Sequence, residues 1–353
     1  MLRPGVWILS ALALLLTLLA SLDLAPAWKL ARGVARPPPR VPSVQAPAPP
    51  PPPWEGGADD REIPRAQPSA RASADLVVVV SIDGLRPDVI TPSMRALHRL
   101  SERAASPQVA RTIGHSETLP SHASMVSGVE PSEHGLNFNA YRPEHGNIDR
   151  PTMFSVARAA GMPTLMFVGK SKLKHILYEP EDAELKVGSM RCRRLLRVAL
   201  PRLKAAKRGL LFMHFADPDF AGHRYGWMSD RYVDAAHDAA ECVEQVVEVI
   251  QQSGRVNRTL LIVTADHGGH DRGHGTQLEV DQRIPWYAWG ARARRGRVQR
   301  DVHTTDTAAT ALAALGLKVP TTMRGRPVTE AIGAALGPVG MPIVGAPIEA
   351  SAP

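Results

Sequence analysis

The sequence is poor in cysteine and in aromatic residues. Two cysteines, Cys192 and Cys242, occur in 353 residues, which excludes a zinc site built from several thiolates. The spacing of these two leaves open whether they pair in an oxidising compartment. Aromatic residues make up 5% of the chain, and none is interleaved with the basic runs, so no stacking on nucleic-acid bases is expected.

Acidic residues are missing from the most basic stretch of the chain. The net charge is +8, and much of the excess lies in two clusters, at 191–208 and 292–300. The first cluster contains eight Arg and Lys residues and no Asp or Glu. Such runs are typical of solvated faces, and attraction to anionic lipid or to a phosphorylated substrate is the alternative.

Charge is also absent from Val6–Leu22, which follows Arg3 near the start of the chain. This apolar run predicts a signal peptide or membrane anchor at residues 1–28. The small residues of Ala25–Ala27 leave cleavage open, and Arg3 favours a cytoplasmic N-terminus. Either outcome predicts an exported protein, anchored in the membrane by its N-terminus or secreted or periplasmic.

The next segment, residues 29–73, contains Pro37–Pro39 and Pro49–Pro53. Such a composition cannot form a packed core and favours an extended linker. We expect one catalytic domain at residues 74–335 and a flexible tail at residues 336–353, which is rich in Gly, Pro and Ala.

Within the predicted domain, short apolar runs alternate with helical patterns. The runs that predict buried strands are Leu76–Ile82, Pro163–Val168, Leu210–Phe215, Leu260–Val263 and Ile284–Trp289. Helices are predicted at Ser93–Ala105 and at Asp230–Gln252, where the apolar residues recur on one face. This alternation predicts an α/β fold with a mostly parallel central sheet sandwiched by helices, in a single compact domain.

Carboxylate and imidazole residues follow three of the predicted strands. Asp83 follows the first; His214, Asp217, Asp219 and His223 follow or end the third; Asp266, His267, His270 and His274 follow the fourth. The carboxyl ends of parallel strands share one edge of a sheet, where sites form. The four-residue spacing of Asp219 and His223 brings both side chains to one side of a helical turn.

These ligand types suit zinc or a similar transition metal, and their number exceeds what one tetrahedral ion needs. We therefore expect two divalent metal ions, Zn²⁺ being favoured, and a hydroxyl nucleophile close to them. The segment Glu117–His134 offers four candidates for that hydroxyl: Thr118, Ser121, Ser124 and Ser127.

Four segments in order, VVVVSIDGLRPD, ETLPSHASMVSGVEPSEHGL, DPDFAGHRYG and TADHGG, carry a family resemblance. With them, the chain resembles the alkaline phosphatase superfamily, and within it the type I phosphodiesterase and nucleotide pyrophosphatase branch. The resemblance covers about 260 residues, from Ala74 to about Gly333.

The resemblance implies a role for each matching position. Asp83, Thr118, Asp266 and His267 would bind one ion, while Asp219, His223 and a further histidine would bind the other. Thr118 stands where the family has its nucleophile. Asn139 stands where the family has an asparagine that holds a non-bridging phosphate oxygen. His122 and His134 are expected to brace the nucleophile segment by hydrogen bonds.

The sequence departs from the family pattern in three places. Ser121 stands where the family usually has Asn. Asn137 competes with Asn139 for the phosphate contact. The third histidine of the second ion lacks its usual context; His274, within Gly-His-Gly-Thr, is the favoured candidate, and His270 and His303 are its rivals.

The predicted function is two-metal hydrolysis of phosphate esters, as in phosphodiesterases and nucleotide pyrophosphatases, through a phospho-threonine intermediate at Thr118. A nucleotide or lipid phosphate ester, or another small-molecule phosphate ester, is the expected substrate. A phosphomonoesterase is the closest alternative, because Lys170, Lys172 and Lys174 would supply cations for a dianionic phosphate. A sulfatase, which would need a Cys/Ser-x-Pro-x-Arg motif at the nucleophile position, and a phosphoglycerol or phosphoethanolamine transferase follow. A non-catalytic, membrane-tethered binding protein is the alternative of another class.

Overall fold

The computed structural model describes residues 72–333 of the chain. The predicted leader and tail and most of the predicted linker lie outside these residues. The strands are β1 (Leu76–Ile82), β2 (Ala105–Pro107), β3 (Ala110–Arg111), β4 (Thr164–Val168), β5 (Glu184–Val187), β6 (Gly209–Phe215), β7 (Thr259–Thr264), β8 (Arg283–Ile284), β9 (Trp286–Gly290), β10 (Gly296–Val298) and β11 (Val302–His303). The α-helices are α2 (Arg95–Arg103), α3 (Thr118–Ser127), α4 (Pro131–His134), α5 (Met153–Ala159), α6 (Cys192–Ala205), α7 (Asp217–Tyr225), α8 (Asp230–Gln252), α9 (Glu279–Gln282), α10 (Asp306–Ala314) and α11 (Thr329–Ile332).

A central sheet runs in the order β10-β2-β9-β7-β1-β6-β4-β5. The run from β7 to β5 is parallel, and β9 is antiparallel to both of its neighbours. Strand β1, which is apolar except for Ser81, is buried along its whole length, as expected in a sheet covered on both faces. The mostly parallel α/β sheet expected from the sequence is confirmed.

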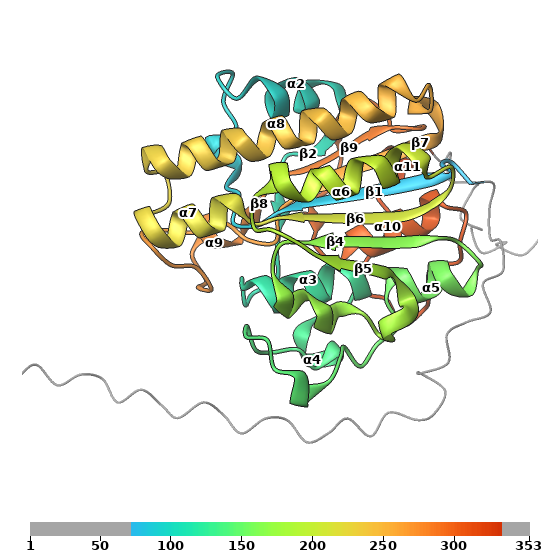
Figure 1. Ribbon diagram of the computed structural model, residues 1–353, viewed down its shortest axis with the longest axis horizontal. Coiled ribbons are helices and arrows are strands. Elements are labelled where there is room, and N and C mark those ends of the chain that lie inside the picture. The colour runs from blue at the N-terminus through green and yellow to red at the C-terminus, as the bar shows by residue number, and fades with distance from the viewer. Residues whose placement is uncertain (1–71, 334–353) are drawn as a thin grey trace, which may run out of the picture. The chain divides into compact units, whose positions relative to one another are not determined.

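Helices cover both faces of this sheet (Figure 1). Helices α2, α6 and α8 form one layer, and α3, α5 and α10 pack together in the other. The long helix α8 has the predicted bounds, and the Ser229 side chain caps it by accepting a hydrogen bond from the Tyr232 amide. Its buried residues include Ala236, Val243 and Ile250, which belong to the predicted apolar stripe.

The predicted strand Ile284–Trp289 is wrong as a single element. The chain forms β8 and β9 instead, which flank Pro285 and belong to different sheets. Strand β8 pairs with β3 in a three-stranded sheet, and β9 pairs with β7 in the central one. Proline lacks the amide hydrogen that a continuing ladder needs, so a break at this position has a direct physical cause.

Cys192 and Cys242 form a disulfide that joins the first turn of α6 to the middle of α8. The cross-link closes a sequence separation of 50 residues. The chain-entropy model assigns such a loop about 4 kcal/mol of stabilisation. A disulfide of this kind fits the exported location that the N-terminal sequence predicts. Within the described stretch, none of the helices is both long and apolar enough to cross a membrane.

Candidate metal centre

Two groups of metal-type ligands lie at the carboxyl ends of the central strands. The first, which we call the buried group, consists of Asp83, Asp266 and His267, and all three side chains are fully buried. Asp83 follows β1, while Asp266 and His267 follow β7, its parallel neighbour in the sheet. Parallel pairing therefore delivers side chains 183 and more residues apart in sequence to one point.

Each carboxylate of this group has one oxygen held by the protein and one left without a hydrogen bond. Asp266 Oδ1 accepts from the backbone amides of Gly84, at 3.1 Å, and His267, at 3.0 Å. Asp83 Oδ2 accepts from His214 Nε2 at 2.8 Å. Asp266 Oδ2 and Asp83 Oδ1, both buried, have no hydrogen-bond partner. Each lies 3.3 Å from His267 Nε2.

The second group, called the half-exposed group, consists of Asp219, His223 and His274. Helix α7 presents Asp219 and His223 one turn apart, so that His223 Nε2 lies 3.3 Å from Asp219 Oδ1. His274 comes from the loop after β7 and places its Nε2 3.6 Å from the same oxygen. Asp219 Oδ1 is buried and has no hydrogen-bond partner, like the free oxygens of the buried group.

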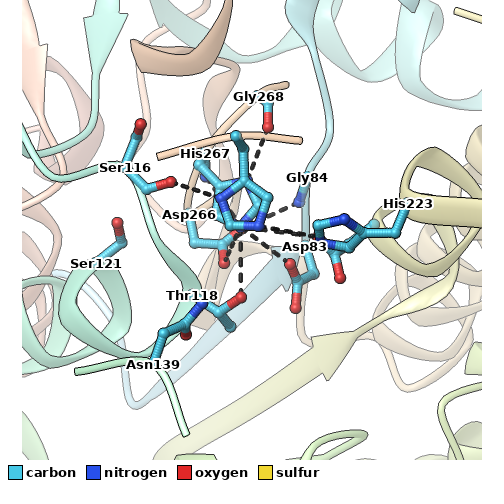
Figure 2. A network of polar contacts seen from close by, with 12 residues as sticks. Asp83, Gly84, Ser116, Thr118, Ser121, Asn139, His223, Asp266, His267 and Gly268 are labelled. Atoms are coloured by element: carbon cyan, nitrogen blue, oxygen red, sulfur yellow. Dashed lines mark hydrogen bonds and ion pairs between the residues drawn. The ribbon is translucent and has the colours of Figure 1, made fainter. Parts of the chain in front are cut away.

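The three histidines of the two groups are oriented in the same way. In each, Nδ1 donates to a backbone carbonyl: His267 to Gly268 at 2.8 Å, His223 to Arg272 at 2.9 Å and His274 to Ser116 at 2.9 Å. Such a bond fixes the tautomer and leaves the Nε2 lone pair free on the side of the carboxylates (Figure 2). This is the arrangement that a metal-ligating imidazole needs.

Trp227 holds the half-exposed group in place. Its ring lies in a slot between two glycines, because a Cβ on Gly222 or on Gly269 would come within 2.6 or 2.2 Å of the indole. The indole Nε1 donates to the Gly84 carbonyl at 3.0 Å, and the ring centroid is 5.1 Å from that of His223 and 5.8 Å from that of His274. The Trp227 backbone amide donates to Asp271 at 2.7 Å, which ties α7 to the loop carrying His274.

Thr118 is the first residue of α3 and lies against the buried group. Its hydroxyl oxygen is 3.4 Å from His267 Nε2 (Figure 2). Beside it, the Asn139 Oδ1 accepts from the Leu119 amide at 3.0 Å. The helix dipole and the Thr118 backbone amide at the N-terminus of α3 favour negative charge at this position.

The two histidines expected to brace the nucleophile segment do so. His122 Nδ1 donates to the Thr118 carbonyl at 2.7 Å, and its Nε2 contacts Ser81 Oγ at 2.9 Å. His134 Nε2 donates to Ser124 Oγ at 3.0 Å while its Nδ1 accepts from the Leu136 amide at 3.2 Å. Helix α3 is thereby anchored at both of its turns by imidazoles rather than by apolar contacts alone.

Two lysines from the segment after β4 reach the same place. Lys170 Nζ lies 2.6 Å from Asp83 Oδ2 and 2.5 Å from Asp219 Oδ2, so its charge stands between the two groups. It is also 3.4 Å from Thr118 Oγ1. Lys172 Nζ donates to Asn139 Oδ1 at 2.7 Å. Because that oxygen already faces Lys172 and the Leu119 amide, the Asn139 amide group is held in a defined orientation.

The charges of the site shift its proton equilibria in opposite directions. Burial opposes ionisation of Asp83, yet Lys170 and the hydrogen bond from His214 hold the pKa of that carboxyl well below its usual value. Burial lowers the pKa of His267, but the carboxylates of Asp266 and Asp83 outweigh it and raise the pKa to about 9. Burial and the charge on His267 lower the pKa of His274 to about 3. The carboxylates therefore favour the charged form of His267, whereas His274 stays neutral.

The remaining candidates from the sequence lie elsewhere. His270 Nδ1 donates to Asp281 at 2.8 Å and belongs to neither group. His303 lies on β11 with its side chain exposed. Asn137 is exposed, whereas Asn139 contacts the α3 N-terminus. Lys174 lies over the Tyr141 ring, at 5.4 Å from its centroid.

Sequence reasoning grouped His214 with the candidate ligands but did not predict its hydrogen bond to Asp83, and it assigned no role to Trp227. A signal existed for His214, because it lies next to the end of a strand that neighbours β1, in register with Ser81. No local pattern marks Trp227, whose slot is built by glycines from two distant segments.

The donor set fits a pair of divalent cations. Three buried carboxylate oxygens have no hydrogen bond, and a buried oxygen of this kind is costly unless a cation or donor satisfies it. Three imidazole Nε2 atoms accompany them, and mixed oxygen and nitrogen ligands suit zinc and similar metals. The two groups are thus candidate metal-binding sites, and the identity of the metal is not fixed by these residues.

Comparison with known proteins places this geometry in a family. The model of the type I phosphodiesterase / nucleotide pyrophosphatase family matches residues 77–310. A venom phosphodiesterase of Macrovipera lebetinus is 24% identical over 219 residues, which are 54% of this chain and 25% of that protein. A 2,3-bisphosphoglycerate-independent phosphoglycerate mutase of Clostridium beijerinckii is 31% identical over 132 residues, or 36% of this chain and 24% of that one. The chain spans about a quarter of the length of these curated relatives.

Solved structures share the fold. Murine ectonucleotide pyrophosphatase/phosphodiesterase 5 superposes with a TM-score of 0.59 at 14% identity, covering 69% of this chain and 96% of that one. The alkaline phosphatase PafA gives a TM-score of 0.62 at 12% identity, covering 75% and 99%. The resemblance inferred from the four sequence segments is confirmed, and the chain belongs to the type I phosphodiesterase / nucleotide pyrophosphatase family.

Proposed function

We propose that this protein hydrolyses phosphate esters, with Thr118 as the nucleophile, and that its substrate is a phosphodiester. The observation that carries the proposal is the position of the Thr118 hydroxyl, at a helix N-terminus and 3.4 Å from a ligand-type histidine of the buried group. The family to which the chain belongs supports the reaction class. The murine relative adds support, since its inactive threonine-to-alanine variant was solved in complex with AMP.

In the first step, the Thr118 oxygen forms a bond to phosphorus while the bond from phosphorus to the leaving alcohol breaks. The bound ions would lower the pKa of the Thr118 hydroxyl and neutralise charge on the phosphate. The Asn139 amide group, oriented by Lys172, and the amides at the α3 N-terminus would hold the non-bridging oxygens. Water then attacks the phospho-threonine, which restores the hydroxyl and releases a phosphate monoester.

A specific observation favours phosphomonoester hydrolysis as the second candidate. The Lys170 ammonium lies 3.4 Å from the Thr118 hydroxyl oxygen. Lys172 donates a hydrogen bond to Asn139, which lies beside that threonine. A monoester carries close to two negative charges at its phosphate and a diester carries one, so added cations stabilise the monoester more. Among the described residues, no comparable contact at the site favours a sulfatase or a transferase.

Retention of the ligands separates these enzymes from a non-catalytic binding protein. The seven residues implied as ligands, Asp83, Thr118, Asp219, His223, Asp266, His267 and His274, are all present and gather at one edge of the sheet. A binding protein that had lost catalysis would have no need for the nucleophile or for the free carboxylate oxygens. We further propose that the protein is exported and that residues 1–28 anchor or direct it to the membrane.

The test compares bis-p-nitrophenyl phosphate with p-nitrophenyl phosphate on the full chain supplied with Zn²⁺, with and without a chelator. Faster, chelator-sensitive release from the diester is the expected result. Preference for the monoester would establish the second candidate. Full chain that binds metal but hydrolyses neither ester would overturn the proposal, and so would turnover that a chelator leaves unchanged.

A further inference from the structure

The outer face of α6 has no role in the site described above. Its inner face packs into the core through Leu195, Leu196, Ala199 and Leu203. Its outer face presents Arg194, Arg197, Pro201 and Lys204, spaced three or four residues apart so that they form one stripe. Val198, which is 52% exposed, lies within the stripe.

Most cations of this stripe have no acidic partner. Arg193 pairs with Asp238 and Glu241, and Arg202 pairs with Glu184, so the flanks of the helix are neutralised. Within the described part of the chain, no carboxylate forms an ion pair with Arg194, Arg197, Lys204 or Lys207. The three cations of the stripe, and Lys207 just beyond the end of α6, thus face solvent without compensation.

A cavity of about 340 Å³ opens at the C-terminal end of the same helix. Its lining combines buried leucines with exposed cations, namely Leu76, Leu165 and Leu210 with Arg202, Lys207 and Arg208. Arg208 is held by the Gly161 carbonyl at 2.9 Å, which keeps its guanidinium at the edge of the cavity. An apolar hollow surrounded by cations is complementary to an amphiphile with an anionic head.

The basic cluster at residues 292–300 has a structural explanation that the cluster at residues 191–208 lacks. Arg292, Arg294 and Arg295 directly precede β10, an edge strand of the central sheet, and Arg297 lies within it. Charged residues at an edge strand prevent another strand from pairing there. Helix α6 lies in the layer over the sheet and has no edge to protect.

The N-terminal part of the chain enters the fold at the same place. The Gly209 amide, four residues beyond the end of α6, donates to the Asp75 carbonyl at 2.9 Å, and Leu76 lines the cavity. The candidate metal centre lies at the other end of the strands, since Asp83 follows the carboxyl end of β1. Binding at α6 would leave that centre open.

We propose that the outer face of α6, together with this cavity, binds the surface of a bilayer that contains anionic phospholipid. The stripe contacts the phosphate head groups, and the cavity receives the beginning of one acyl chain. A soluble anion would engage the cations but not the leucines, so the combined chemistry favours lipid. Each cation near an anionic surface strengthens association by about fivefold.

The test reconstitutes the full chain with nanodiscs of phosphatidylcholine alone or with about 30% phosphatidylglycerol, and labels lysines with an amine reagent. Labelling is measured for each lysine by mass spectrometry. We expect Lys204 and Lys207 to react at least about threefold more slowly with the anionic discs, and about 0.5 M salt to remove the difference. Exposed Lys318, which follows α10 of the opposite helix layer, serves as the internal reference. Equal labelling of Lys204 and Lys207 in both discs would overturn the proposal.

Matched variants distinguish binding at the outer face of α6 from a general effect of the net charge. Arg194→Ser with Arg197→Ser should abolish most of the protection, whereas Arg294→Ser with Arg295→Ser, which changes the net charge equally, should retain it. Ala205→Glu, which adds a carboxylate to the cavity, should reduce protection relative to Ala205→Gln. Equal losses in the two arginine pairs would show a general charge effect and contradict a binding surface on α6.

Discussion

The two ligand groups differ in what surrounds them. Asp83, Asp266 and His267 are fully buried at the ends of two paired strands, and they are oriented by His214 of β6, by backbone groups next to the strand ends and by Lys170. In the half-exposed group, His223 is exposed and Asp219 and His274 come from a helix and a loop. Strand pairing fixes the first group, while Trp227 and two turns fix the second. We therefore expect one rigid site, shared with the nucleophile, and one that exchanges its ion more easily.

The largest effect should follow from removing the nucleophile of the rigid site. Thr118→Ala should lower turnover of the phosphate ester by about a thousandfold or more, which corresponds to about 4 kcal/mol of transition-state stabilisation. Metal content, measured by mass spectrometry, should stay close to that of the wild type because the carboxylates and imidazoles remain.

Thr118→Ser is the matched control for this change. It keeps the hydroxyl and removes one methyl group from a buried position, so it should retain measurable turnover. Wild-type rates in Thr118→Ala would refute the assignment of the nucleophile.

Metal removal should distinguish the two groups directly. During titration with a chelator, the ion of the half-exposed group should leave first, because water reaches His223 and not the buried group. His223→Gln should retain about one ion per chain, whereas His267→Gln should lose the ion of the rigid site and should also unfold at a lower denaturant concentration. His237→Gln on α8, remote from both groups, is the control. Equal loss of both ions in His223→Gln would mean that the groups act as one unit.

Substitution of Trp227 should affect the second group alone. Trp227→Leu removes the ring from the slot between Gly222 and Gly269 and breaks the hydrogen bond to Gly84. Loss of a residue that orients metal ligands without binding the metal itself typically lowers metal affinity by about 10- to 100-fold. We expect that loss for the weaker ion in a calorimetric titration, with the tighter ion unchanged. Trp286→Leu, at the buried first residue of β9, controls for a loss of stability. Equal weakening of both ions in Trp227→Leu would contradict the separation of the two groups.

The smallest effect near neutral pH should come from His134, which contacts α3 away from the ligands and contributes to the free energy of unfolding. Burial lowers the pKa of His134 to about 3, so the native state keeps this imidazole neutral while the unfolded chain takes up a proton near pH 6.5. As the pH falls from 6.5 toward 3, the free energy of unfolding should therefore decrease by about 1.4 kcal/mol per pH unit from this residue.

Denaturant unfolding of the wild type and of His134→Gln, both in chelator, measures that slope. The variant should show a shallower decrease in the free energy of unfolding with falling pH. Parallel pH dependences would mean that His134 is not held neutral by its surroundings.

Much of the fold could be predicted because the decisive patterns are local. Nearly continuous apolar runs, such as Leu76–Ile82, are typical of strands in a parallel sheet that is covered on both faces. The break at Pro285 was missed because the apolar character of the run continues across it. The pairing of Cys192 with Cys242 required the packing of α6 against α8, which no spacing encodes.

The sequence by itself indicated four of the five predicted strands, the candidate ligand types and the Asp219–His223 pair, since each depends on residues adjacent or one turn apart, and four short motifs in order indicated the family. Only the tertiary structure brought His274 rather than His270 or His303 to the second group, Asn139 rather than Asn137 to Thr118, and Lys170 between two carboxylates. These choices depend on contacts between segments far apart in the chain. Their outcome is decided by loop paths and by close packing, as in the slot of Trp227, and neither leaves a periodic signal in the sequence.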